Sequence, residues 1–135
     1  MQSQNSMNSN AINAPSHKAL VVDTDKDRYR RKERITQIQN AGFKAYPVLR
    51  LQDACVRCKP GSFDLVAVNA TENGAQAVEI CDQIKKSNPN LQVFLVSSSP
   101  DTPSRDYVVS DWSQVVQKLG SHNKADSTQK TLQVA

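Results

Sequence analysis

The stretch Lys18-Ala19-Leu20-Val21-Val22-Asp23-Thr24-Asp25 decides the fold of this chain. A short apolar run between polar flanks is typical of a strand that is buried on both faces of a sheet. The acidic residues directly after it would lie at the carboxyl edge of that sheet, where open α/β folds place their ligand sites. The stretch therefore predicts a central strand and draws attention to the acids at its end.

Further apolar runs alternate with helical patterns along the chain. Strands are predicted over 18–23, 43–49, 63–68, 91–96 and 106–109, and helices over 26–41, 51–58, 75–87 and 112–119. Such alternation favours a parallel sheet with helices on both faces and right-handed crossovers. We predict a flavodoxin-like three-layer sandwich, α/β in class, with a five-stranded parallel sheet in the order 2-1-3-4-5.

One crossover helix is missing from this pattern. The connection between the last two predicted strands spans only residues 97–105, which are rich in Ser, Pro and Asp. A parallel crossover usually needs a dozen residues or more. The fourth helix is therefore expected to be absent or reduced, which could leave the flank of the strand over 91–96 uncovered.

The first predicted helix, over 26–41, has clear end signals. Gly42 is a natural residue to follow its C-terminus, and Tyr29 is expected to extend its buried face. Three polar side chains before the helix are candidates for its N-cap: Asp23, Thr24 and Asp25.

The composition indicates one folded domain with polar ends. The chain has 135 residues, 38% of them hydrophobic, and a net charge of +4. We expect a disordered arm over 1–17, a domain over 18–120 and a disordered tail over 121–135. No apolar stretch is long enough to span a membrane, and the N-terminus lacks the features of a signal peptide, so a cytoplasmic location is expected.

Three cysteines, Cys55, Cys58 and Cys81, are expected to be free thiols. The first two form a CxxC pattern, which in a redox site would open a helix directly after a strand. Here the pattern lies at the end of a predicted helix. A structural role is favoured, and redox or metal use is the alternative.

Four short motifs, in order at the ends of four predicted strands, resemble receiver domains of two-component response regulators. The motifs are Val21-Val22-Asp23-Thr24-Asp25, Phe63-Asp64-Leu65-Val66-Ala67-Val68-Asn69, Gln92-Val93-Phe94-Leu95-Val96-Ser97-Ser98 and Tyr107-Val108-Val109-Ser110-Asp111-Trp112. The resemblance covers about Lys18 to Gly120. It implies the flavodoxin-like fold and a place in bacterial two-component signalling or a phosphorelay.

The resemblance also implies where a receiver's phosphorylation chemistry would lie. Receivers hold Mg²⁺ with two acids after the first strand and an aspartate after the third, which accepts the phosphoryl group. Asp23 matches the first acid, Thr24 replaces the second, and Asp25 lies one position further on. Asn69 stands at the acceptor position, and a carboxamide cannot form the acyl phosphate.

The remaining receiver positions are also changed. Ser97 matches the switch hydroxyl, whereas Ser110 replaces the lysine that grips the phosphoryl oxygens. Mg²⁺ prefers several hard oxygen ligands, and phosphoryl transfer needs both metal and cation to balance charge. The sequence therefore predicts a degenerate pseudo-receiver with no bound metal or cofactor and no enzymatic activity.

We therefore expect a stand-alone, phosphorylation-independent interaction module. Its partner would be a kinase, a response regulator or another signalling protein. Contacts are predicted around Ser98 to Arg105 and the face near Tyr107 and Trp112, although Trp112 as core packing is the alternative. A small enzyme at the strand ends, using Asp23, Asp25, Ser97 and Ser110, is disfavoured because no histidine or lysine base lies among them.

The basic run over 26–34 is the basis of a second hypothesis. Arg28, Arg30 and Arg31 could dock an acidic partner or contact nucleic acid. The run spreads around the helix, so a solvated surface is the plainer interpretation.

Overall fold

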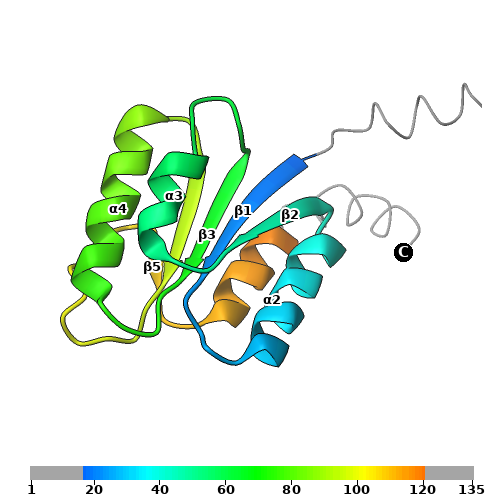
Figure 1. Ribbon diagram of the computed structural model, residues 1–135, viewed down its shortest axis with the longest axis horizontal. Coiled ribbons are helices and arrows are strands. Elements are labelled where there is room, and N and C mark those ends of the chain that lie inside the picture. Colours follow the sequence, from blue (N-terminus) through cyan, green and yellow to red (C-terminus); the bar gives the residue numbers. More distant parts are fainter. Residues whose placement is uncertain (1–16, 121–135) are drawn as a thin grey trace, which may run out of the picture.

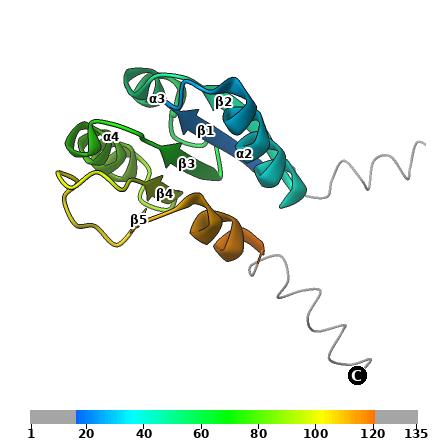
Figure 2. The same cartoon turned by 90° about the horizontal axis from the view of Figure 1, so that it is seen from below.

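The computed structural model describes residues 17–120, which form a five-stranded parallel sheet between two helical layers. The sheet order is β2-β1-β3-β4-β5, which confirms the predicted flavodoxin-like topology. Figures 1 and 2 show α3 and α4 on one face, and α2 with the C-terminal helix on the other. The elements are β1 (His17–Asp23), α2 (Arg28–Asn40), β2 (Phe43–Val48), α3 (Leu51–Arg57), β3 (Leu65–Asn69), α4 (Gly74–Ser87), β4 (Gln92–Val96), β5 (Val108–Val109) and a C-terminal helix described over 112–120. The predicted arm and tail lie outside the described residues, apart from His17.

Alternate residues of the central strands enter two separate hydrophobic clusters. Leu20 and Val22 of β1 face α3 and α4, whereas Ala19 and Val21 face α2 and the C-terminal helix. This period of two is the geometry of a strand covered on both sides. It confirms that the opening stretch forms a central strand.

The register of the sheet brings the ends of β1, β3 and β4 together. Asp23 pairs with Asn69, and Asn69 pairs with Val96, so all three strands end at one level. Ser97 follows directly. The polar residues singled out from the sequence therefore begin at the same edge.

The N-terminus of α2 differs from the expectation in two respects. Its N-cap is Asp27, whose Oδ1 accepts the backbone N–H groups of Tyr29 (2.8 Å) and Arg30 (3.3 Å). The capping prediction for Asp23, Thr24 and Asp25 was therefore wrong, because the chain extends further before the helix begins. Tyr29 is 73% exposed and does not join the buried face. Gly42 follows the helix with φ of 99°, as predicted.

The helices over the other face pack as expected from their sequences. The buried residues of α3 are Leu51 and Ala54, and those of α4 are Gly74, Ala77, Val78, Ile80, Cys81 and Ile84. None of the helices within residues 17–120 is long and apolar enough to cross a membrane.

The connection between β4 and β5 contains no helix, as the sequence predicted. The flank of β4 is nevertheless not left open, which corrects the expectation of an uncovered surface. Tyr107 comes from the connection and lies in the same cluster as Val93 and Leu95 of β4, with 7% of its surface exposed. The segment runs beside α4 in Figure 2. One buried ring therefore contributes cover that a helix would otherwise provide.

Candidate functional site

Asp23 and Asn69 form the centre of the polar site at the carboxyl edge of the sheet. Both are buried, with 4% and 8% of their surfaces exposed. The amide Nδ2 of Asn69 donates a hydrogen bond to Asp23 Oδ1 over 3.0 Å. The acceptor position thus presents an amide donor to the acid beside it, where a receiver would present a second carboxylate.

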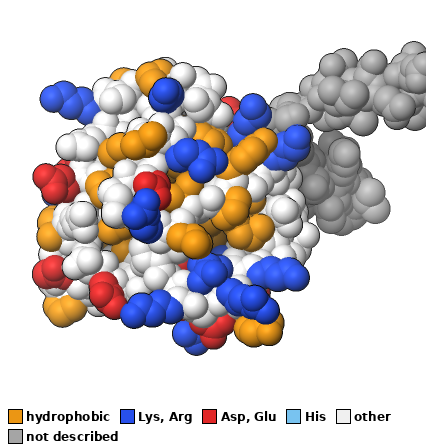
Figure 3. Space-filling view, in the orientation of Figure 1, with side chains coloured by type: hydrophobic (Ala, Val, Ile, Leu, Met, Phe, Trp, Pro, Cys, Tyr) orange, Lys and Arg blue, Asp and Glu red, His pale blue; other side chains and the backbone are white. Residues whose placement is uncertain are grey.

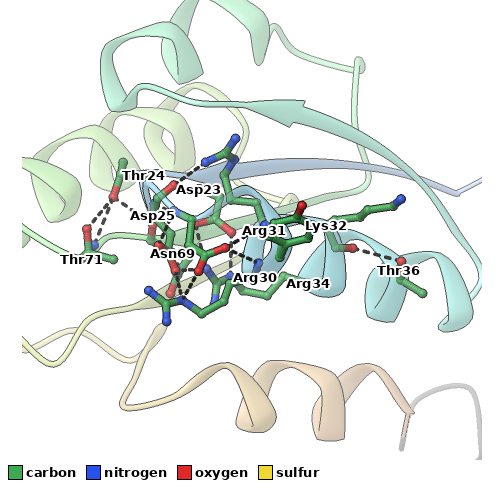
Figure 4. A network of polar contacts seen from close by, with 12 residues as sticks. Asp23, Thr24, Asp25, Arg30, Arg31, Lys32, Arg34, Thr36, Asn69 and Thr71 are labelled. Atoms are coloured by element: carbon green, nitrogen blue, oxygen red, sulfur yellow. Dashed lines mark hydrogen bonds and ion pairs between the residues drawn. The ribbon is translucent and has the colours of Figure 1, made fainter.

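The guanidinium of Arg34 lies against two carboxylates at this edge (Figure 4). Its Nε donates to Asp23 Oδ2 over 2.6 Å, and its Nη2 donates to Asp25 Oδ2 over 2.5 Å. A longer contact of 3.4 Å joins Nη2 to Asp23 Oδ1. The Arg34 side chain is only 15% exposed. One arginine of α2 therefore pairs with both acids at the end of β1.

Asp25 reaches this site because its own loop turns back towards β1. Its backbone N–H donates to Asp23 Oδ1 over 3.1 Å, and its Oδ1 accepts the backbone N–H of Asp27. Arg30 Nε adds a contact of 3.0 Å to Asp25 Oδ2. These short local turns place the Asp25 carboxylate beside Arg34, although it lies one position beyond the family's second acid.

The charges of this network stabilise one another. The hydrogen bond from the Asp27 backbone, followed by that from Arg30, holds the pKa of Asp25 well below its usual range. Burial opposes the charge of Arg34, but its bonds to Asp23 and Asp25 outweigh that effect and raise its pKa. Asp25 is therefore ionised and Arg34 charged at neutral pH, as an ion pair removed from most water requires.

Thr24 follows Asp23 in the sequence, but its side chain contacts the loop after β3 instead of the acids. Its hydroxyl donates to the carbonyl of Asn69 over 3.3 Å, lies 3.2 Å from the Thr71 hydroxyl, and accepts the Thr71 backbone N–H. Thr24 therefore ties the loop after β1 to the loop after β3.

Ser97, at the switch position, is held by the segment that replaces the missing helix. Its hydroxyl lies 2.6 Å from that of Thr102 and accepts the backbone N–H of Ser99 over 3.3 Å. A Cβ on Gly74 would meet Thr102 Oγ1 at 2.0 Å, so a larger residue at the start of α4 would force this loop to shift. Ser97 is therefore fixed against a closely packed loop.

Ser110, at the lysine position, belongs to the start of the C-terminal helix. Its backbone N–H donates to Gln114 Oε1 over 2.8 Å, and Asp111 Oδ1 accepts the backbone N–H of Gln114 over 3.3 Å. Among the described residues, neither Ser97 nor Ser110 makes a hydrogen bond with Asp23 or Asp25. The four residues of the enzyme hypothesis thus form no shared hydrogen-bonded centre.

The residues at this edge do not fit the divalent cation that receivers hold. A hard cation would need the carboxylate oxygens of Asp23 and Asp25 as ligands. These oxygens already accept hydrogen bonds from the guanidinium of Arg34 and the amide of Asn69. Across residues 17–120, no group of three or more His, Cys, Asp or Glu side chains is arranged to hold a metal ion. Asp23 and Asp25 are instead the anionic half of an internal ion pair.

Arg34 was not identified as a site residue from the sequence, where it was simply the last member of the basic run. A usable signal was present: Arg30 and Arg34 are four residues apart, and such pairs share one helix face. Acids lie at the end of the preceding strand. Helical spacing and charge together indicate which of the basic residues face the acids.

The other basic residues predicted to bind partners lie in different environments. The Arg31 guanidinium donates to the backbone carbonyl of Asp25 over 2.7 Å, and Arg30 bonds to the Asp25 carboxylate. Arg28 lies over the exposed ring of Tyr29, with 5.4 Å from its guanidinium carbon to the ring centre. Two of the three arginines are thus engaged within the chain.

Tyr107 and Trp112, the predicted aromatic contacts, are both buried. The Tyr107 hydroxyl donates to Asp82 Oδ1 over 2.5 Å and lies 3.2 Å from the carbonyl oxygen of Val78. Trp112 is 9% exposed and packs in the cluster below α2. Burial confirms the core interpretation of Trp112. The partner contacts expected around the two rings stay a prediction.

The cleft between α2 and the C-terminal helix remains open to solvent beside Trp112. It encloses about 500 Å³. Its lining is formed by Glu33, Arg34, Gln37, Trp112, Ser113, Val116 and Gln117. Arg34 thus lines this cleft as well as bonding to the acids.

The three cysteines are free, and burial raises the pKa of each thiol, that of Cys81 to about 12. Thiols of this kind are poorly nucleophilic at neutral pH because they remain protonated. Their surroundings favour the structural interpretation of the CxxC pattern.

Comparisons with known proteins agree with the fold. No protein-family model matches the sequence, and no curated protein matches it. A CheY-like response regulator receiver domain protein from Methanospirillum hungatei JF-1 aligns with a TM-score of 0.63 at 11% identity, over 85% of this chain and 99% of that one. The crystal structure of the histidine kinase ThkA in complex with the response regulator protein TrrA contains a chain that aligns with a TM-score of 0.55 at 20% identity, over 76% of this chain and 97% of that one. The chain therefore has the fold of receiver domains.

Proposed function

We propose that residues 18–120 act as a pseudo-receiver, a signalling or interaction module that works without phosphorylation, without Mg²⁺ and without enzymatic activity. The observation that carries this proposal is the position of Arg34, which bonds to both acids at the end of β1. In a receiver that charge is balanced by a metal ion, which is bound and released. Here it is balanced by a side chain of the same molecule.

The amide at position 69 supports the same conclusion. Asn69 is buried and its amide donates a hydrogen bond to Asp23, so this side chain is engaged with that acid. It lacks the nucleophilic oxygen that phosphoryl transfer would require. Metal, acceptor and lysine are thus replaced by Arg34, Asn69 and Ser110, and the fold remains as a scaffold for binding.

A protein of the signalling class is the partner that the fold favours. One structural neighbour is a response regulator protein in complex with a histidine kinase. The cleft between α2 and the C-terminal helix is a concave surface of about 500 Å³ on this chain. A protein partner docked there would contact Arg34 directly, which links partner binding to the state of the acidic site.

The test compares Mg²⁺ binding and phosphorylation in the wild type and a repaired variant. Backbone amide resonances of Asp23 to Asp25 should not shift with Mg²⁺, and acetyl phosphate should add no phosphoryl mass. The variant Arg34→Gln with Asn69→Asp frees two acids and adds a third, and it should bind Mg²⁺. Arg28→Gln, which removes an exposed arginine outside the network, is the matched control. A Mg²⁺-dependent shift at Asn69 in the wild type, or its phosphorylation, would contradict the proposal.

Nucleic-acid contact through α2 is the second candidate, and the exposed pair of Arg28 and Tyr29 favours it. An aromatic ring with 73% of its surface free and a guanidinium over it can stack on an unpaired base. Binding to single-stranded RNA or DNA should then weaken steeply with salt and with Arg28→Glu. Unchanged affinity in Arg28→Glu, or no binding at about 50 mM salt, would dispose of this candidate.

A further inference from the structure

A shallow apolar hollow lies beside the edge strand β2 and the short helix α3. It encloses about 400 Å³. Its lining is formed by Pro47, Val48, Leu49, Arg50, Asp53, Val56 and Arg57. Leu49 is 56% exposed and Val56 is 67% exposed, and only Tyr29 joins them as an exposed large hydrophobic residue of the described chain.

The core does not require these two apolar side chains. In α3 the buried residues are Leu51 and Ala54, which are three positions apart and face α4 and the sheet. Val56 lies away from that stripe, and Leu49 belongs to the connection after β2. Two exposed apolar residues on one hollow indicate an interaction surface more strongly than either would alone.

The charges around the hollow are mostly basic. Arg50 Nε bonds to Asp53 Oδ2 over 3.0 Å, which leaves that pair neutral. Arg57 makes no ion pair or side-chain hydrogen bond within the described residues. Between residues 44 and 59 the sequence has four basic side chains and one acidic. Figure 3 shows hydrophobic side chains gathered on this face, with Lys and Arg among and around them and few acids.

We propose that this hollow binds an acidic, amphipathic segment of a protein partner. Apolar side chains of the segment would cover Leu49 and Val56, and a carboxylate would pair with Arg57. This names the partner class of the proposed interaction module but does not depend on the state of Arg34. The surface lies on β2 and α3, apart from the cleft between α2 and the C-terminal helix.

Charge and shape favour this occupant over three others. A second copy in a two-fold dimer would place Arg57 and its basic surroundings against themselves. The chain's own residues 121–135 have basic Lys124 and Lys130 against a single acid, and residues 1–16 have no charged side chain. A membrane surface favours protruding apolar groups, whereas this surface is hollowed and contains the carboxylate of Asp53.

The experiment selects binders from a phage-displayed library of random linear peptides, with the full-length protein as the target. Counter-selection uses Val56→Ser, a change at an exposed position that should leave folding intact. We expect enriched peptides to combine Asp or Glu with spaced apolar residues. Arg57→Glu should weaken their binding by about tenfold, and a peptide whose acids are replaced by Lys should recover affinity for that variant. Tyr29→Ser, the matched exposed control, should bind as the wild type does.

Several results would overturn the inference. Enrichment of basic or purely apolar peptides, or binding that Val56→Ser leaves unchanged, would show that the hollow does not select acidic segments. Binding to anionic lipid vesicles that depends on Val56 and Arg57 would assign the surface to a membrane, and dimerisation abolished by Val56→Ser would assign it to a second copy. Any of these results leaves the Mg²⁺ test of Arg34 unaffected, so failure here is distinguishable from failure of the pseudo-receiver proposal.

Discussion

Two regions at the carboxyl edge of the sheet are held together in different ways. At the end of β1, the guanidinium of Arg34 is held by Asp23 and Asp25. In the connection between β4 and β5, Tyr107 contributes cover that a helix would otherwise give. The first region depends on charge and the second on apolar packing. In each region one side chain, Arg34 or Tyr107, makes the central contacts.

The difference lies in how much each region depends on exclusion of water. The side chains of Asp23 and Asp25 are 5% and 10% exposed, so their pairing with Arg34 takes place largely out of water. Asp82 and Arg105, which accompany Tyr107, are 40% and 42% exposed. An ion pair counts for much when its loss strands a buried charge, and for little when water can take its place. The ring, and not the ion pair, should therefore hold the second region.

Replacement of Tyr107 by alanine should have the largest effect on stability. The ring is 93% buried against the cluster of β4 and α4, and its loss leaves a cavity that the short connection cannot fill. We expect the free energy of unfolding to fall by about 3–5 kcal/mol, as for other buried aromatic residues. Urea unfolding followed by far-ultraviolet circular dichroism measures it. Tyr107→Phe, which keeps the ring and loses the hydrogen bond that the hydroxyl donates, should lose about 1 kcal/mol. Equal losses in the two variants would show that the hydroxyl is what matters.

Replacement of Arg34 by alanine should have the next largest effect. It leaves Asp23 and Asp25 side by side without their shared cation, and only Arg30, bonded to Asp25, and the neutral amide of Asn69, bonded to Asp23, remain to hold them. We expect a loss of about 2–3 kcal/mol, below the figure for a fully buried pair because the Arg34 side chain is 15% exposed. Added Mg²⁺ should restore part of the stability of Arg34→Ala. It should not stabilise variants with substitutions elsewhere in α2. If Arg34→Ala were as stable as the wild type, the ion-pair network would contribute nothing to the free energy of unfolding.

The fold could be predicted from the sequence because its determinants are local. The runs over 18–23 and 91–96 are apolar at successive positions, and they became β1 and β4 with ends within one residue of the prediction. The short connection over 97–105 likewise predicted an absent or reduced helix, and no helix lies there. Strand order followed from alternation and handedness, which do not depend on side-chain detail.

The site could be predicted only in part, because its contacts depend on side-chain direction across elements. The resemblance to receivers implied that Asp23 and Asn69 lie at one site, and they are hydrogen-bonded neighbours. The inward turn of Arg34 depends on where α2 begins, and its start at Arg28, capped by Asp27, was placed too early by the sequence. The contact between Thr102 and Ser97 is formed by a loop without periodicity, so no pattern indicated it.

Thr102 lies in the same connection as Tyr107, and its packing against Gly74 can be tested separately. Gly74→Ala would place a Cβ 2.0 Å from Thr102 Oγ1 and 3.1 Å from Ser97 Oγ, so the loop must move. We expect a loss of about 1–2 kcal/mol, in which the overpacking cost is offset in part by the better helix propensity of alanine. Adding Thr102→Ala, which removes the clashing hydroxyl, should recover much of it. Additive losses in a double-mutant cycle of thermal unfolding would contradict this packing.

Acid should distinguish the two ion-paired regions. Hydrogen bonds hold the folded pKa of Asp25 well below its usual range, first from the Asp27 backbone and then from Arg30. The bonds from Arg105 and Tyr107 lower that of Asp82 as well. Because the folded pKa is lower, the unfolded chain takes up these protons first. The stability that the two acids contribute is thus complete above about pH 3.9 and is lost as pH falls further. Asp25→Asn should flatten this acid-side decline more than Asp82→Asn does, in urea midpoints measured from neutral pH to about pH 3. If the two variants flattened the decline in stability equally, acid would not distinguish the region of Arg34 from the region of Tyr107.

Replacement of Arg105 by alanine should have the smallest effect of all. Its guanidinium bonds to Asp82 over 2.9 Å, but both partners are well exposed, so water can replace the contact. Tyr107 keeps its bond to Asp82 in this variant, and the ring stays buried. The melting temperature should therefore differ little from that of the wild type and should lie well above that of Tyr107→Phe. A fall as large as that of Tyr107→Phe would mean that Arg105 positions Asp82 for the tyrosine hydroxyl. In that case the second region would depend on charge as the first does, and the contrast between an ionic and an apolar region would no longer hold.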